Sequence, residues 1–197
     1  MKGSSRVRAA LLLGITGLAL AIAAVLVFFA GAEQGERIEW TVTLVGSSGQ
    51  QRTMSYEEIV AMPSYEGRGG SFSSVGVVSG PYAVKGVPVE YLCDLVGGLT
   101  PSDVLFVSAT DGYSMVFDYS QIQGGFDSYE PGTMRLVPHG DLELLLMYEQ
   151  EGRPLSHNDG RPLRIATAGT EDLLTEGHYW VKWVDSIEVL RIGGTDG

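Results

Sequence analysis

The sequence predicts a strand-rich α+β domain that follows an N-terminal membrane-spanning helix. Three observations lead to this fold class. Positions 11–30 form an uncharged apolar stretch, and about 20 such residues suffice for a helix that crosses a bilayer. After it, short apolar runs and alternating segments typical of strands recur, while helix-start signals are few. No period of roughly 20–50 residues repeats, which argues against a solenoid or propeller. We therefore expect an anchor or signal segment over residues 1–32 and one globular domain over residues 33–197.

The charges around the apolar stretch predict its orientation. Lys2, Arg6 and Arg8 precede it, whereas Glu33 comes first after it. Because positive flanks stay in the cytoplasm, we expect a membrane-anchored domain on the extracytoplasmic side. An alternative stays open, since Ala30-Gly31-Ala32 matches a signal-cleavage site. The domain would then be secreted, so both interpretations export it.

The exported part is strongly acidic and contains one thiol. All 24 acidic residues but only ten of the 13 basic ones follow residue 32, giving a formal charge of −14. Such a domain repels nucleic acid, so we expect no nucleic-acid partner. Cys93 is the single cysteine, which excludes an internal disulfide and a cysteine cluster for zinc or iron–sulfur. We expect it to be a small buried apolar residue.

The first half of the domain combines one strand, two helices and a loop. Alternation from Ile38 to Leu44 predicts a strand, and Ser55 with Glu58 forms a capping box for a short helix that ends near Pro63. Residues 64–80 are rich in Gly and Ser and are expected to be a loop with one short strand inside it. Pro88 then starts a helix that runs to Val96, before Gly97-Gly98.

The second half is expected to be mostly strands. A hairpin is predicted from 104–109 and 114–117 around Asp111-Gly112. A loop with several aromatic residues covers 124–138. Residues 142–148 are expected to be an apolar strand or a buried segment, and further strands are expected at 163–168 and 186–192. Turns are expected at 152–154 and 158–160.

The order of several short motifs resembles a known family. They are Lys85-Gly86-Val87-Pro88-Val89, Ser108-Ala109-Thr110-Asp111-Gly112-Tyr113, Glu151-Gly152-Arg153-Pro154-Leu155, Gly160-Arg161-Pro162-Leu163-Arg164 and Val181-Lys182-Trp183-Val184. Over residues 38–192 this pattern resembles the oxidoreductase molybdopterin-binding domain of sulfite oxidases. The resemblance implies a sulfite-oxidase-like fold, molybdopterin (the molybdenum cofactor) and oxidoreductase activity.

The same resemblance implies a set of site residues. The family holds molybdenum through a cysteine that lies before the helix that follows its Gly-Val motif, which is Gly86-Val87 in this sequence. Here Ser74 stands within a residue or two of that place. Ser74 is therefore the candidate metal ligand. Cys93 belongs to the core helix and cannot easily replace it. The family binds the pterin phosphate with cationic residues, and the candidates for cofactor binding here are Ser74, Arg161, Arg164, His178 and Lys182.

Two functions stay open at this point. One is a molybdopterin-dependent oxidoreductase in which Ser74 ligates the metal, with a separate redox protein as its electron partner. The other is a non-catalytic module that binds a ligand or a receptor protein and has lost the molybdenum site. The resemblance implies a cleft at the place where the family binds its pterin, and residues 171–178 form an insertion expected to lie near that cleft, where it could cover it. A metal site of His139, His157 and His178, or a hydrolytic triad of Ser73 or Ser74 with His178 and Asp111, has no supporting motif.

Overall fold

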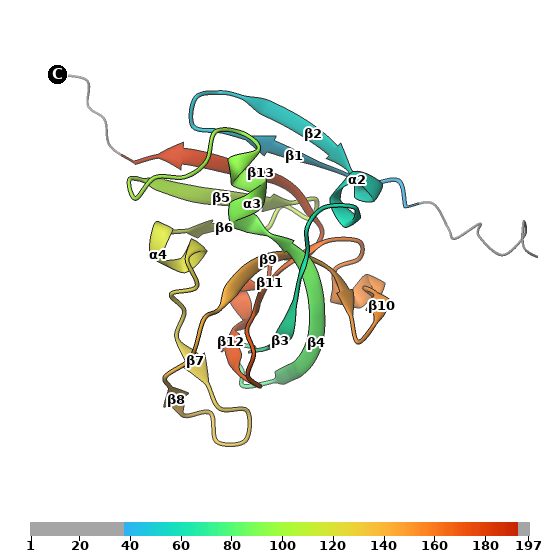
Figure 1. Ribbon diagram of the computed structural model, residues 1–197. Helices are drawn as coiled ribbons and strands as arrows, with labels where there is room; N and C mark the ends of the chain where they lie inside the picture. Colours follow the sequence, from blue (N-terminus) through green and yellow to red (C-terminus); the bar gives the residue numbers. More distant parts are fainter. Residues whose placement is uncertain (1–37, 193–197) are drawn as a thin grey trace, which may run out of the picture. The chain divides into compact units, whose positions relative to one another are not determined.

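Residues 38–192, which the computed structural model describes, form two β-sheets that lie one above the other, with short helices at their edges (Figure 1). The upper sheet of Figure 1 has the order β2 (Gln51–Ser55), β1 (Thr41–Val45), β13 (Val184–Arg191), β5 (Asp103–Ala109) and β6 (Ser114–Phe117). β1 and β13 run parallel, which brings the first and last strands of this unit side by side.

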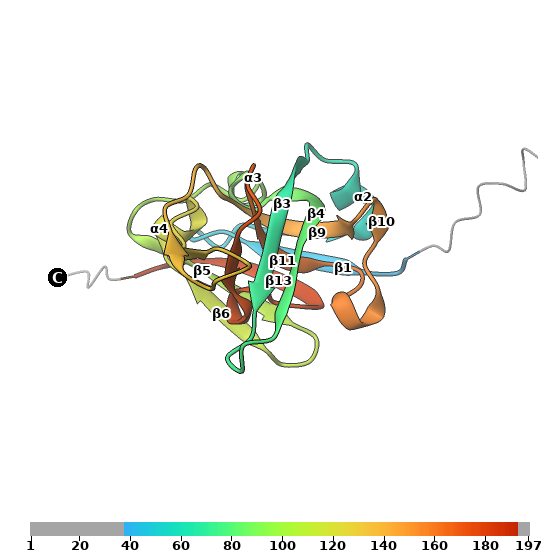
Figure 2. The same ribbon diagram turned by 90° about the horizontal axis from the view of Figure 1, so that it is seen from below.

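The lower sheet is built around a long hairpin. Its order is β10 (Arg153–Pro154), β9 (Glu143–Gln150), β4 (Val78–Pro88), β3 (Tyr65–Phe72), β12 (Leu174–Glu176), β7 (Ser128–Tyr129) and β8 (Leu136–Val137), and β11 (Arg164–Ala168) pairs with β9. Seen from below, β3 and β4 lie in front of the upper sheet (Figure 2). The helices are α2 (Tyr56–Val60), α3 (Val89–Asp94), α4 (Tyr119–Ile122) and the 3-10 turns η1 (His157–Asp159) and η2 (Gly177–Tyr179).

Strand β9 separates two apolar clusters, because both of its faces are buried. Leu144, Leu146 and Tyr148 join the large cluster with residues of the upper sheet, including Leu105 and Ile187. Leu145 and Met147 point to the opposite face and join a smaller cluster with Trp180. A strand buried on both faces has a continuous apolar run rather than alternation. This explains why residues 142–148 are apolar at almost every position.

The predicted strand-rich fold with few short helices is observed, and so is the capping box. The Ser55 hydroxyl accepts from the Glu58 amide at 3.2 Å, and the Glu58 carboxylate accepts from the Ser55 amide at 2.8 Å. The helix begun near Pro88 covers Val89–Asp94, two residues shorter than expected. The predicted hairpin is observed as β5 and β6.

The prediction of a loop over residues 64–80 is wrong, because this segment forms β3, a tight turn and the start of β4. Its glycines allow close backbone packing rather than irregular structure. A Cβ atom at Gly69 would lie 2.1 Å from the carbonyl oxygen of Thr167, and one at Gly67 would lie 2.7 Å from that of Gly169. Strand β3 therefore needs glycine where the end of β11 crosses it.

Several short elements were absent from the sequence prediction, among them β2, α4 and β12, and also β7 and β8 within the expected loop 124–138. The strand β2 lies at a sheet edge and is mostly exposed, so it has little apolar signature. Among residues 38–192 no helix is long and apolar enough to cross a membrane. The predicted membrane-spanning stretch 11–30 lies outside the described residues.

Candidate functional site

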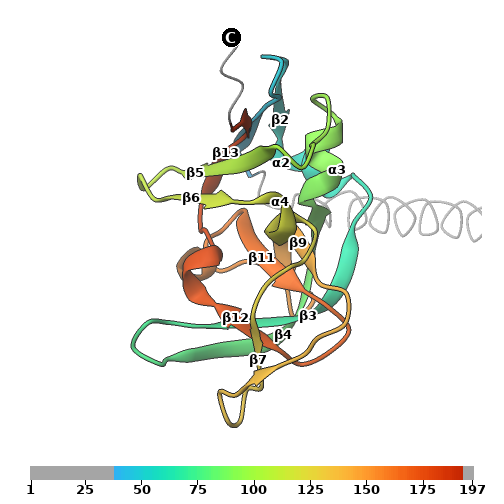
Figure 3. The same cartoon turned by 90° about the vertical axis from the view of Figure 1, so that its left-hand side faces the viewer.

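A cleft of about 470 Å³ opens where the β3–β4 hairpin passes the β12–η2 segment. Figure 3 shows this hairpin extending beside β12. The hairpin contributes Ser71, Phe72, Ser73, Ser74, Val77 and Ser79. The remaining lining residues are Asp159, Arg164, Glu176, Gly177, His178 and Lys182. The volume lies within the range of roughly 300–1,000 Å³ that is usual for small-molecule sites.

Arg164 provides a buried positive charge in this cleft. Its exposed fraction is 7%, and its Nε has no hydrogen-bond partner. Nη1 donates to the carbonyl oxygen of Asp159 at 3.4 Å, and the guanidinium lies over the Trp180 ring at 4.9 Å from the centroid. Burial lowers the pKa of Arg164 to about 10, against the opposing effect of Asp159. The side chain is therefore still cationic at neutral pH, but it is poorly solvated.

Lys182 adds a second cation next to Arg164. The two residues form an isolated β-bridge, and Lys182 Nζ donates to the carbonyl oxygen of Asn158. Burial and, secondarily, the charge of Arg164 lower the pKa of Lys182. Among the described residues neither cation forms an ion pair with a carboxylate. The charge of Asp159, which also lines the cleft, opposes both shifts without forming an ion pair with either cation. Two neighbouring cations that no carboxylate contacts directly can bind an anion between them.

His178 and Glu176 form the other polar group of the cleft. The Nδ1 atom of His178 lies 3.1 Å from a carboxylate oxygen of Glu176. The His178 ring also packs against the Tyr179 ring, with 3.9 Å between the two ring centroids. The backbone carbonyl of His178 accepts a hydrogen bond from the Tyr113 hydroxyl at 2.9 Å. These contacts fix the imidazole at the rim. The insertion 171–178 thus borders the cleft through its last three residues.

The serines of the β3–β4 hairpin line the cleft together with these charged groups. No cysteine thiol is among the residues that line it. Ser73 is engaged in the turn, where its Oγ accepts from the Val77 amide at 3.1 Å. Ser74 is exposed at the tip. Cys93 lies in the large core cluster on α3, and burial raises its pKa to about 12. Within residues 38–192 no group of three or more His, Cys, Asp or Glu side chains could hold a metal ion.

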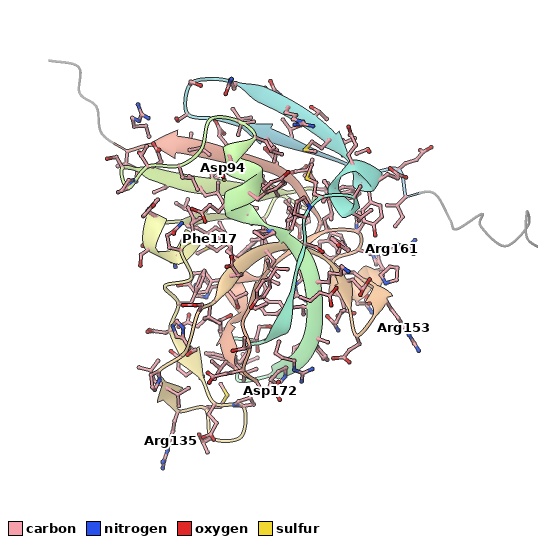
Figure 4. The ribbon with its side chains drawn as sticks, viewed as in Figure 1. Asp94, Phe117, Arg135, Arg153, Arg161 and Asp172 are labelled. Carbon is pink, nitrogen blue, oxygen red and sulfur yellow. The ribbon has the colours of Figure 1, made fainter. Side chains whose placement is uncertain are left out.

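Four of the five predicted site residues therefore line one cleft, while Arg161 does not. Arg161 lies near α2, where its charge lowers the pKa of Tyr56 against the larger effect of burial. Figure 4 places it on the side of the molecule that carries α2 and β10. Its position differs because Arg161 precedes β11 by three residues, whereas Arg164 is the first residue of that strand.

Two acidic lining residues, Asp159 and Glu176, were absent from the sequence prediction. Both lie in short segments, at η1 and at the end of β12. No local motif marks them. The tight turn that places Asp159 is formed by Gly160, which has a positive φ of 98°, and by Ser156, whose hydroxyl accepts from the Asp159 amide at 3.2 Å.

Together, the fold and the cleft define a strand-rich α+β domain with a small-molecule site of mixed charge. The family model of the oxidoreductase molybdopterin binding domain matches residues 30–192, so the chain belongs to that family. This confirms the resemblance seen in the motifs.

A solved structure agrees on the fold. The chain is similar to the sulfane dehydrogenase SoxCD from Paracoccus pantotrophus, with 15% sequence identity and a TM-score of 0.58. The match covers 81% of this chain and 40% of that chain, so the present chain corresponds to less than half of the larger protein. No curated protein matches the chain.

The lining residues fit the family's cofactor only in part. The cation pair and the hairpin serines suit its phosphate, since charged donors make the strongest hydrogen bonds to phosphate oxygens. The resemblance implies a cysteine thiolate as the family's metal ligand, and the cleft offers hydroxyl, carboxylate, imidazole, amine and guanidinium groups instead. The residues present therefore do not provide the family's metal ligand.

Proposed function

We propose that this chain is a membrane-tethered, extracytoplasmic member of the family. Its cleft binds a phosphorylated organic anion and provides no protein thiolate to ligate molybdenum. The observation that carries this function is the Arg164–Lys182 pair, which lines the cleft and has no carboxylate within ion-pair distance among the described residues. Membrane attachment and export are supported by the apolar stretch 11–30 and its flanking charges. A separate redox or receptor protein would recognise the domain when its cleft holds the anion.

Phosphate titration of the full-length protein tests this function. Inorganic phosphate, measured against chloride at equal ionic strength, is expected to bind the wild type. Lys182→Gln should weaken binding about tenfold or more, because a charge-assisted hydrogen bond is lost. Lys85→Gln is the matched control, since Lys85 pairs with Glu66 at 2.6 Å and does not line the cleft. Equal phosphate affinity in wild type and both variants would argue against the proposed site.

A second candidate function is a molybdenum oxidoreductase in which Ser74 ligates the metal. It is favoured by the position of Ser74, which lines the cleft from the hairpin tip. The full chain, produced in a molybdopterin-competent host, is analysed for molybdenum and released pterin. Under the proposed function we expect no stoichiometric molybdenum. Near-stoichiometric metal that falls in Ser74→Ala but stays in Ser73→Ala would support the second candidate instead.

A further inference from the structure

The Arg164 guanidinium packs against the ring of Trp180. The indole is 4% exposed, and the guanidinium carbon of Arg164 lies 4.9 Å from its ring centroid. Among the described residues the guanidinium also donates one long hydrogen bond, 3.4 Å, to the carbonyl of Asp159. An aromatic face attracts a desolvated cation and holds it against the ring. Any rotation of the indole would therefore displace the positive charge in the cleft.

Trp180 is in turn held by a series of buried hydrogen bonds. Its Nε1 donates to the Thr175 hydroxyl at 2.9 Å, and the hydroxyls of Thr175 and Thr167 are 2.8 Å apart. Both threonines are 2% exposed, so water does not compete for these groups. A buried donor that loses its partner is costly, which makes the series a specific constraint on the ring.

These hydrogen bonds connect two strands that each contribute a charged residue to the cleft. Strand β11 carries Thr167 and also Arg164, whereas β12 carries Thr175 and also Glu176. The backbone of β11 is paired with β9, and that of β12 with β3 and β7. The threonine pair is therefore a direct side-chain link between the strand with the buried cation and the strand that leads into the Glu176–His178 pair.

We propose that Thr167, Thr175 and Trp180 are positioning residues that set the Arg164 guanidinium for an oxyanion in the cleft. They act through Arg164 and do not touch the anion themselves. The inference rests on the proposed function, because it assumes that the cleft binds a phosphate group. It adds a set of residues that the family match does not single out and that lie behind the cleft.

The test compares isosteric and conservative changes at one position in the full-length protein, with inorganic phosphate as the probe. Thr175→Val removes the hydroxyl and keeps the shape, and phosphate binding should weaken about five- to tenfold. Thr175→Ser keeps the hydroxyl and should bind nearly as well as wild type. Ser128→Ala is the matched control, because it removes another buried hydroxyl, which donates to Val137 at 2.9 Å outside the cleft. It should lower stability without changing phosphate affinity.

Trp180→Phe provides an independent variant if Thr175→Val does not fold. It keeps an aromatic face under Arg164 but removes the N–H donor, and a similar loss of affinity is expected. Wild-type affinity in folded Thr175→Val and Trp180→Phe would overturn the positioning role and leave the proposed function intact. Absence of phosphate binding in the wild type would overturn both, so the two failures are distinguishable.

Discussion

Two buried charges in this domain have opposite surroundings. The Asp103 carboxylate is 2% exposed and accepts from the Thr100 amide at 2.8 Å, from the Thr100 hydroxyl at 2.7 Å and from Arg191 at 3.3 Å. Burial alone would raise its pKa, but these donors outweigh burial and lower it. Arg164 is buried with no carboxylate partner among the described residues, and its pKa falls. The fold thus stabilises the charge of Asp103 and destabilises that of Arg164.

The contrast predicts that Arg164 is kept for binding rather than for stability. A buried charge that no ion pair compensates carries a desolvation cost, and an apolar side chain of similar size removes that cost. The free energy of unfolding of Arg164→Met should therefore lie within about 1 kcal/mol of wild type, or be higher. Asp103→Asn, the comparison variant, should lose about 1–3 kcal/mol, because it weakens partnered hydrogen bonds. Denaturant unfolding measures both free energies.

Phosphate titration completes the same experiment. Arg164→Met should lose phosphate affinity, while Asp103→Asn should retain it, since Asp103 does not line the cleft. A large loss of stability in Arg164→Met would mean that the guanidinium holds the fold together, contrary to this interpretation.

The sequence predicted those elements whose structure depends only on residues close to one another in the chain. The capping box at Ser55 and the hairpin turn at Asp111-Gly112 depend on neighbouring residues, and both were predictable. The β3–β4 hairpin was not, because its glycines serve contacts with distant backbone. Gly69 is needed only because the carbonyl of Thr167, far along the chain, passes over it. A glycine in a sequence gives no sign of whether it marks a turn or a close approach.

Family motifs predicted part of the site, although Arg161, which belongs to the same motif as Arg164, does not line the cleft. Arg164 and Lys182 belong to family motifs, and Ser74 and His178 were placed relative to such motifs. All four line the cleft, although their binding roles stay predictions. The link from Thr167 through Thr175 to Trp180 has no sequence pattern, because its members come from different elements and meet only in the folded domain. Asp159 and Glu176 escaped prediction for the same reason.

At the scale of the whole molecule, the distribution of charge separates two parts of the chain. Three basic residues and no acidic one lie in residues 1–32, whereas the remainder has a formal charge of −14. A strongly acidic domain is repelled by anionic lipid headgroups. Attachment to a membrane would therefore depend on the apolar stretch 11–30 and not on the domain surface. The cation pair would attract a small anion only within the cleft.

Membrane attachment gives the last prediction, made for the full-length chain. The protein should stay in the membrane pellet after an alkaline wash, and its intact mass should include residues 1–32, because a span of about 20 apolar residues is held by the bilayer. Protease added to the extracytoplasmic side should degrade the acidic domain. Changing two apolar residues of the stretch to aspartate, for example Leu18 and Val25, should shift the protein to the soluble fraction or block its export. A soluble wild-type protein whose mass begins after Ala32 would instead establish the secreted form, and the phosphate site would then act free of the membrane.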